Sequence, residues 1–279
     1  MLGTRILTAV ILVPLVLAAL FLLPPVGWAA VSLVVVVVGS AEWANLSGYR
    51  GSTRAMFMIG TLAIGSPLIY ALSSDFDRGW PEGIVFVACG AATFFWIVIA
   101  PLWLASRWKP VSTAGMAVAG WIALLGAWVA LGTLQAHSPW LVLAAMAVVW
   151  IADTAAYFAG RAFGKHKLAP TISPGKTWEG VAGALVAVAI YALALVPLAT
   201  AGGHSGPVSG AAVIVWVMLA LVLVALSVEG DLFESLLKRH AGVKDSGRLL
   251  PGHGGILDRI DALIAAMPPA ALLAQAYLR

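Results

Sequence analysis

Charged residues are scarce in this chain, because Asp, Glu, Lys and Arg make up only 10% of its 279 residues. Cysteine is scarcer still. Cys89 is the only one, which excludes both an intrachain disulfide and a zinc site built on cysteine. The chain also has no internal repeat, no low-complexity tract and no long polar stretch outside residues 161–177 and 229–259. We therefore expect no separate soluble domain and a single domain over residues 1–279.

Apolar residues are what the chain has in abundance. They make up 62% of the sequence, the mean hydropathy is +0.99, and several apolar runs reach about 18 residues, which exceeds the core of a soluble protein. The sequence thus predicts an all-α, polytopic integral membrane bundle of about nine transmembrane helices. The expected spans are residues 6–23, 27–46, 55–72, 83–105, 114–134, 138–160, 178–200, 208–228 and 260–278.

Basic residues predict the orientation, because Lys and Arg near the ends of spans are retained in the cytoplasm. With the N-terminus inside, all of the sixteen Lys and Arg except Arg78 and Arg279 fall on the cytoplasmic face. Of the twelve acids, only Asp75, Asp77 and Glu82 fall outside. We expect a protein of the cytoplasmic (inner) membrane whose basic face, in a chain of net charge +4, meets anionic headgroups and cytosolic polyanions.

The few charges are concentrated between Glu229 and Asp261. This segment holds six of the twelve acids and five of the sixteen Lys and Arg. Ionisable groups are costly near lipid and usually mark a functional site there. We therefore expect residues 1–150 to form a structural or dimer scaffold and residues 151–279 to form the catalytic part.

One helical face near the start of this segment carries acids, a hydroxyl and a base together. Counted from Asp231, the residues Glu234, Ser235 and Lys238 recur at i+3, i+4 and i+7, while apolar residues occupy the opposite arc. The basic residues that follow are Arg239, Lys244 and Arg248. A mixed polar face of this kind indicates a site for an anionic substrate and its counter-ion.

A PGHGG turn, residues 251–255, follows the basic residues. Its glycines allow the backbone to approach an anion closely, and its amides can donate to that anion. The helix that the turn opens places Asp258 and Asp261 at i and i+3 on one face. Aspartates from two helix ends can hold magnesium together with phosphate oxygens, although Asp231 and Asp258 taken singly could also be acids stabilised by the helix dipole.

Asp153 lies about two turns inside the expected sixth span. A carboxylate at that depth must face a protein interior or a wet cavity. Two interpretations stay open, a functional acid and a helix-packing hydrogen bond with Thr154 or a neighbouring span. The small residues Ala156, Gly160 and Gly164 instead predict a close helix contact.

The segment ISPGKTWEG, residues 172–180, resembles a phosphate-binding loop only superficially. A Walker A motif needs a glycine where residue 170 is proline, and no parallel sheet is expected to hold such a loop. We expect a turn shaped by Pro174 and Gly175 that opens a helix, with hydroxyls and Lys176 facing an anion. The alternative is a helix cap with an interfacial lysine that extends to the membrane surface.

At these residues the sequence resembles the phosphatidate cytidylyltransferase family, also called the CDP-diacylglycerol synthases. The residues that stand at the spacing of that family's C-terminal motif are Ser235, Lys238, Arg239, Lys244, Asp245, Gly247, Pro251, His253, Gly254, Gly255, Asp258, Arg259 and Asp261. The segments DTAAYFAGRAFGKHKLAPTISPGKTWEG and GDLFES are also similar, so the resemblance covers roughly residues 150–261.

The resemblance implies a homodimeric, all-helical membrane enzyme that joins CTP to phosphatidic acid and releases pyrophosphate. It implies Mg²⁺ as the cofactor and leaves open whether a second cation binds. It also implies membrane lipid as a partner and no nucleic-acid partner. We assign catalytic roles to Asp231, Lys238, Arg239, Asp245, His253 and Asp258. Substrate binding is assigned to Ser173, Lys176, Thr177, Ser235, Lys244, Arg248, Gly254, Gly255 and Arg259. Metal binding is assigned to Asp231, Asp258 and Asp261, and the roles of Asp153, Glu179 and Glu234 are left open.

Two other functions remain as alternatives. A CTP-dependent kinase of a polyprenol or similar lipid alcohol would use a comparable site but transfer the γ-phosphate. A magnesium or phosphate transporter would carry polar groups through the bilayer midplane and commonly shows inverted repeats, whereas the charges here stop at one face. The DG-x-x-AR and D-x-x-x-D pattern of CDP-alcohol phosphotransferases is absent.

Overall fold

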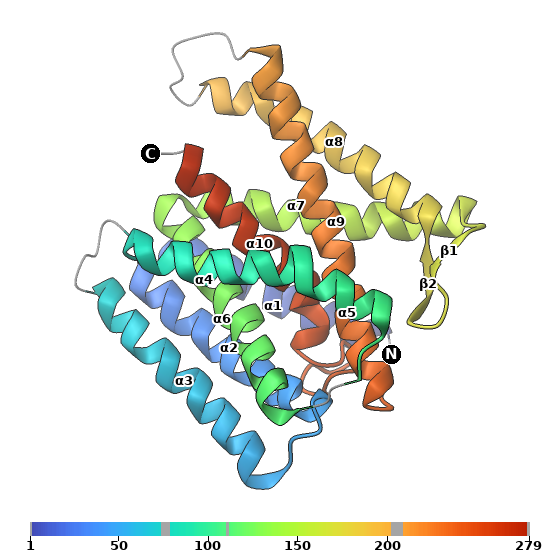
Figure 1. Cartoon of the computed structure of the whole chain (residues 1–279). Helices are drawn as coiled ribbons and strands as arrows, with labels where there is room; N and C mark the ends of the chain where they lie inside the picture. Colours follow the sequence, from blue (N-terminus) through green and yellow to red (C-terminus); the bar gives the residue numbers. More distant parts are fainter. Residues whose placement is uncertain (1, 74–78, 110–111, 202–208, 278–279) are drawn as a thin grey trace.

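The structure is a computed structural model that describes residues 2–73, 79–109, 112–201 and 209–277 (Figure 1). Its α-helices are α1 (Leu2–Leu22), α2 (Pro25–Leu46), α3 (Gly51–Ser73), α4 (Glu82–Phe94), α5 (Ala100–Ser106), α6 (Thr113–His137), α7 (Pro139–Phe163), α8 (Trp178–Ala201), α9 (Gly210–His240) and α10 (Leu257–Tyr277). A π-helical turn, η1 (Phe95–Ile99), joins α4 to α5. Asp75, Asp77, Arg78 and Arg279, which the sequence places outside, lie beyond the described residues.

The all-α membrane bundle predicted from the sequence is confirmed. Within the described ranges, eight helical segments are long and apolar enough to cross a membrane, and α4, η1 and α5 together form one of them. Each coincides with one expected span. The remaining expected span corresponds to α1, whose apolar part Val10–Leu22 is shorter. Helix α10 continues through Pro268 and Pro269 and is one of the eight.

Helices α2, α6 and α10 form the centre of the bundle. More than half of each span is buried, against 22% for α3, α7 and α8. Glycines make this close packing possible in α6, because a side chain at Gly120 would collide with the Trp43 indole and one at Gly126 would collide with Ala92. The large aromatic residues of neighbouring helices therefore fill space that α6 leaves open.

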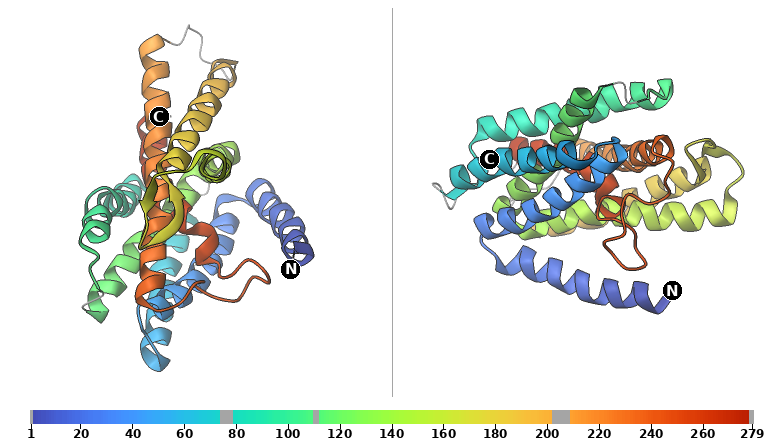
Figure 2. Two further views of the ribbon diagram at one scale, coloured as in Figure 1. Left: turned by 90° about the vertical axis from the view of Figure 1, so that its right-hand side faces the viewer. Right: turned by 90° about the horizontal axis from the view of Figure 1, so that it is seen from below.

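Small residues also join α7 to α8, as the sequence predicts. A side chain added at Gly160 would lie 2.9 Å from the Thr177 hydroxyl, and one at Gly180 would lie 2.8 Å from the carbonyl oxygen of Ala156. The two helices pack along much of their length. Helix α8 and the first half of α9 extend beyond the other helices, as Figure 2 shows.

One local expectation is wrong. Residues 173–177 do not form a turn, because strand β2 (Ser173–Thr177) pairs antiparallel with β1 (Lys167–Ala169), and the chain reverses between them. Helix α9 contains both the expected span 208–228 and the expected charged face, because it continues as one helix to His240. Its last three turns are therefore a rigid extension of a membrane-spanning helix, and they carry most of the charged face.

Candidate active site

The charged residues gather at one end of the bundle, near the lower right of Figure 1. Four elements meet there: the β1–β2 hairpin, the last turns of α9, the loop of residues 241–256 and the first turn of α10. The apolar remainder of α9 and α10 fixes these polar turns in place, because the two helices pack against each other. The site is thus built on helix ends rather than on free loops.

The polar face expected on α9 is present. The Ser235 hydroxyl donates to Asp231 Oδ1 over 3.3 Å, and Lys238 Nζ donates to Glu234 Oε2, each pair lying one helical turn apart. Phe233, on the opposite arc, is 1% exposed and stacks on Trp43 with ring centroids 6.2 Å apart. The aromatic contact holds the apolar arc of α9 against α2, and the polar residues lie on the other arc of the helix.

Lys238 joins α9 to α10. Its Nζ contacts Glu234 on its own helix and lies 2.7 Å from Asp258 Oδ1 at the start of α10. The side chains of Lys238, Glu234 and Asp258 are 13%, 5% and 6% exposed, so this triad is shielded from solvent. A buried ion pair is stable only if its remaining lone pairs are satisfied by hydrogen bonds.

Asp258 meets that requirement with donors from the preceding loop. Its Oδ2 accepts from the Ser246 amide at 2.9 Å, from the Ser246 hydroxyl at 3.0 Å and from the Gly255 amide at 2.8 Å. Both carboxylate oxygens are therefore occupied by donors of this chain. Asp258 ties the loop to the triad.

Glu42 of α2 is a site residue that the sequence assignment missed. The residue is 6% exposed, and its carboxylate accepts three hydrogen bonds, from the Ser246 hydroxyl at 3.0 Å, the Ile256 amide at 3.1 Å and the Leu257 amide at 2.7 Å. The amides are free donors at the N-terminus of α10, where a negative charge is favoured. The signal that could have found it is a lone acid within an apolar span.

Two glycines of the loop are required by this carboxylate. A side chain at Gly247 or Gly255 would collide with the Glu42 carboxyl group. Gly254 has a φ of 81°, in the left-handed region that favours glycine. The loop backbone therefore lies close to two carboxylates of this chain, Glu42 and Asp258. Binding of substrate by Gly254 and Gly255 stays a prediction.

The hairpin reaches α9 through Lys176. Its Nζ lies 2.8 Å from Asp231 Oδ2 and donates to the Val228 carbonyl at 3.2 Å. At the turn between the strands, Arg239 Nε of α9 donates to the carbonyl of Ile172 at 3.2 Å. These contacts hold the Lys176 side chain of the hairpin against Asp231 of α9.

Two residues of β2 and one of the first turn of α8 differ in position. Ser173 is half-buried at the start of β2. Thr177 is buried, and its hydroxyl accepts from the Gly180 amide at 3.1 Å, so it caps the first turn of α8. Glu179 accepts from the His166 amide and lies 2.6 Å from His166 Nδ1, which ties α8 to the base of the hairpin.

A second group of acids lies around Asp231. Asp153 of α7 is within electrostatic range of Asp231, Lys176 and Arg259. It is therefore part of the same charged cluster, although it is placed on another helix. Its neighbour Thr154 donates to Trp150 on its own helix, so the hydroxyl takes part in local helix hydrogen bonding.

Asp261 interacts with Asp231 and with Glu234. The backbone of α10 lies against α9 there, because a side chain added at Gly230 would lie 2.5 Å from the Asp261 carbonyl. Glu234 Oε1 is buried and has no hydrogen-bond partner among the described residues. A buried, unpartnered carboxylate oxygen beside a second carboxyl group is a position where a cation or a shared proton stabilises the site.

The loop and the first turn of α10 contribute residues that are open to solvent. Lys244, Asp245, Arg248 and Arg259 are exposed, and His253 is half-buried. A side chain added at Gly254 would lie 3.5 Å from Cβ of Asp245, so Asp245 is close to the PGHGG turn. The roles of all five residues stay predictions.

The family model of the cytidylyltransferase family matches residues 3–277. The chain belongs to this family. Phosphatidate cytidylyltransferase from Pseudomonas aeruginosa is 40% identical over 98% of this chain and 97% of its own, and that from Haemophilus influenzae is 36% identical over 96% of each. Phosphatidate cytidylyltransferase from Brucella suis is 40% identical over 95% of this chain and 90% of its own. The resemblance stated for residues 150–261 is confirmed and extends over nearly the whole chain.

The acids of this cytidylyltransferase-family site are hard oxygen ligands, the type that Mg²⁺ prefers. Within the described part of the chain, no three His, Cys, Asp or Glu side chains are grouped closely enough to hold a metal ion. This does not conflict with magnesium, because Mg²⁺ is commonly bound by one or two carboxylates together with substrate phosphates and water. Glu234 Oε1, which has no hydrogen-bond partner among the described residues, is one carboxylate oxygen of this type, and Asp261 lies beside Glu234. Which acids hold the ion stays a prediction.

Proposed function

We propose that this protein transfers the cytidylyl group of CTP to phosphatidic acid, giving CDP-diacylglycerol and pyrophosphate. The observation that carries the proposal is the charged cluster at one end of an apolar bundle, with Lys176 on Asp231 and Lys238 on Asp258, in a chain of this family. A lipid phosphate at the membrane surface and a soluble triphosphate can both reach such a position. The names of the full-length relatives support the same reaction.

In the proposed reaction, an oxygen of the phosphatidate phosphate attacks the α-phosphorus of CTP, and the bond to the bridging oxygen of pyrophosphate breaks. No strong base is required, because the phosphomonoester is largely ionised at neutral pH. The chain's task is to position two polyanions and to neutralise their charge. The cations available for this are Lys176, Lys238, Arg239, Lys244, Arg248 and Arg259, with hydrogen bonds from Ser173 and Ser235.

Magnesium is part of the proposal, held by Asp231 and Asp261 with Glu234 beside them. When bound it would supply charge neutralisation at the phosphate oxygens. Asp258, whose oxygens are filled by Lys238, Ser246 and Gly255, would position the loop and the triad. A second cation stays an open part of the proposal.

We place the charged end of the bundle on the cytosolic side of the inner membrane, with the N-terminus cytoplasmic, on the basis of the distribution of Lys and Arg. CTP then approaches from the cytosol and phosphatidic acid from the membrane. We also propose that the protein is a homodimer. Cross-linking in native membranes, followed by mass measurement in detergent, tests this proposal.

The deciding experiment uses purified protein, phosphatidate vesicles, Mg²⁺ and CTP labelled either at the α- or at the γ-phosphate. Label from the α-position should enter the lipid, and label from the γ-position should appear in pyrophosphate. Lipid labelled from the γ-phosphate would instead identify a lipid kinase, and label in neither product would reject the transfer. An arm with EDTA tests the metal, since turnover without any divalent ion would reject the magnesium assignment.

A further inference from the structure

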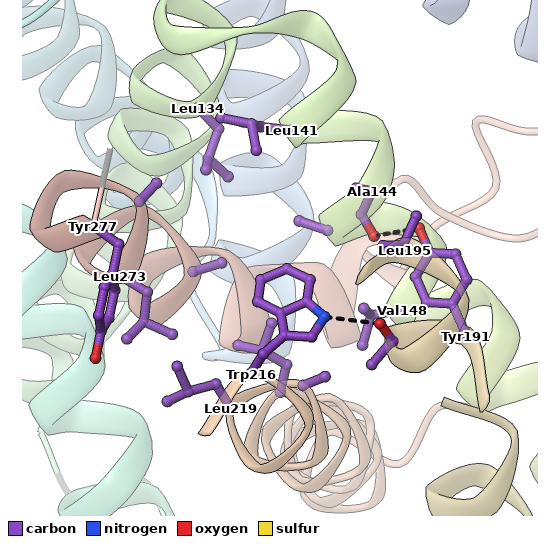
Figure 3. A pocket seen from close by; sticks show the side chains of 16 residues that line it. Leu134, Leu141, Ala144, Val148, Tyr191, Leu195, Trp216, Leu219, Leu273 and Tyr277 are labelled. Carbon is purple, nitrogen blue, oxygen red and sulfur yellow. Dashed lines mark hydrogen bonds between the residues drawn. The ribbon is translucent and has the colours of Figure 1, made fainter. Parts of the chain in front are cut away.

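An apolar cavity of about 270 Å³ lies between α7, α8, α9 and α10, away from the charged residues (Figure 3). Val148, Ala192, Ala220, Leu223 and Ala270 form its buried walls, and every residue around it is Ala, Val, Leu, Tyr or Trp. Trp216 and Tyr277 stand at its rim and are exposed. Neither a headgroup nor an ion would find a charged partner there.

The polar atoms of the cavity walls are largely used within the protein. Trp216 Nε1 donates to the carbonyl of Ala192 at 2.9 Å, and the Tyr191 hydroxyl donates to the carbonyl of Ala144 at 3.3 Å (Figure 3). Apolar cavities of this kind stay dry and take apolar guests, and one of about 150 Å³ already holds benzene. The larger cavity here suits a longer piece of hydrocarbon.

The helices that form the cavity also carry the acids of the charged site. Val148 precedes Asp153 by five residues on α7, Leu223 precedes Asp231 by eight on α9, and Ala270 follows Asp261 by nine on α10. At 1.5 Å per residue, the cavity begins roughly 8–14 Å along the helices from the acids. Half of the hydrocarbon core of a bilayer is about 15 Å, so a lipid whose phosphate lies at the acids extends its chain to this depth.

We infer that this cavity receives the distal part of one acyl chain of the phosphatidate substrate and thereby sets a preference for chain length. The inference rests on the proposed function, since it needs a lipid phosphate at the charged site. A second copy of the protein is a poorer occupant, because a flat helix contact would leave the hollow unfilled and forfeit dispersion contacts. A flexible hydrocarbon chain fills an irregular hollow without leaving voids.

The test fills the cavity and measures chain-length preference. Ala274→Phe places a ring in the cavity from α10, and Ala276→Phe, two residues further on an exposed position outside the cavity, is the matched control. For each protein, kcat/KM is measured in mixed micelles with dipalmitoyl and with dioctanoyl phosphatidate. The ratio of the two values does not depend on the fraction of folded protein, so partial misfolding leaves it unchanged.

We expect Ala274→Phe to lower the dipalmitoyl to dioctanoyl ratio about tenfold, the effect of overpacking a filled site, while Ala276→Phe keeps the wild-type ratio. Ala220→Leu adds a smaller side chain to the cavity from α9 and should also lower the dipalmitoyl to dioctanoyl ratio. This variant provides the test if Ala274→Phe does not fold. An unchanged ratio in both cavity variants, with or without a change in oligomeric mass, would overturn the acyl-chain assignment and leave the proposed function intact. Wild-type protein that transfers no cytidylyl group to either lipid would instead reject the proposed function.

Discussion

The N-terminal helices and the C-terminal helices satisfy their polar groups in different ways. In the N-terminal half, indole N–H groups donate to backbone carbonyls of neighbouring helices, as Trp43 does to Met116 and Trp128 to Ala29. In the C-terminal half, ammonium and carboxylate groups pair with each other, as in Lys238 with Asp258. Neutral bonds to backbone have one fixed partner, whereas charged groups can exchange a protein partner for a substrate phosphate. The first arrangement suits a scaffold and the second suits a binding site.

Glu42 is the exception that joins the two halves. It belongs to α2, yet its hydrogen bonds are to Ser246, Ile256 and Leu257 of the C-terminal loop and helix. The comparison therefore predicts three grades of sensitivity. Charged pairs of the C-terminal half should matter most for turnover, Glu42 next, and the indoles of the N-terminal half only for stability.

The largest effect is expected for Lys238→Met. The substitution leaves the buried carboxylates of Glu234 and Asp258 without their cation, and loss of one partner of a buried pair costs about 3–5 kcal/mol. Turnover should be abolished and the midpoint of thermal unfolding in detergent should fall. Arg54→Met, at an exposed position of α3, is the control for loss of a surface charge. Wild-type turnover in Lys238→Met would contradict the division between the two halves.

Glu42→Gln should have the next largest effect. The amide side chain presents N–H donors toward the donors of Ser246, Ile256 and Leu257, so the loop loses its register with α10. We expect kcat to fall about 100-fold, the effect of a small misplacement of catalytic groups. Glu42→Asp retains the charge and should recover part of this loss. If Glu42→Gln changes unfolding temperature but not kcat, Glu42 belongs to the scaffold alone.

The sequence predicts those features that depend on local periodicity. The shared face of Asp231, Glu234, Ser235 and Lys238 is confirmed by hydrogen bonds one turn apart, and apolar runs predict the spans. A helix period is a property of neighbouring residues, so a single sequence reveals it. The assigned catalytic, substrate and metal roles of these residues stay predictions.

The sequence does not reveal contacts that depend on tertiary structure. Glu42 and Ser246 are 204 residues apart, and nothing local indicates that they meet. The hairpin was missed because Pro174 and Gly175 are typical of turns, whereas here they lie within β2, which is paired to a strand of three residues. Hydropathy alone also does not show that the span 208–228 and the charged face belong to one helix, α9, which packs against α10.

Lys176→Gln should have a smaller effect than Glu42→Gln. Lys176 and Asp231 are partly exposed, 22% and 34% for their side chains, so their ion pair adds little to stability. A lost charge-assisted hydrogen bond to phosphate would raise KM for one substrate about tenfold and leave the unfolding temperature within error. Varying CTP and phosphatidate separately identifies which substrate Lys176 contacts. An unchanged KM for both would remove Lys176 from the binding site.

Trp128→Phe should have the smallest effect on turnover. Trp128 is fully buried, and its indole donates to the Ala29 carbonyl at 2.9 Å, so phenylalanine leaves that carbonyl unpaired and a small void. Such losses cost about 1–3 kcal/mol of stability. The unfolding midpoint should fall while kcat per folded molecule, normalised by active-site titration, equals that of the wild type. A matching fall in kcat would mean that the N-terminal helices transmit strain to the charged site. The difference between neutral hydrogen bonds to backbone and exchangeable charged pairs would then no longer separate the scaffold from the binding site.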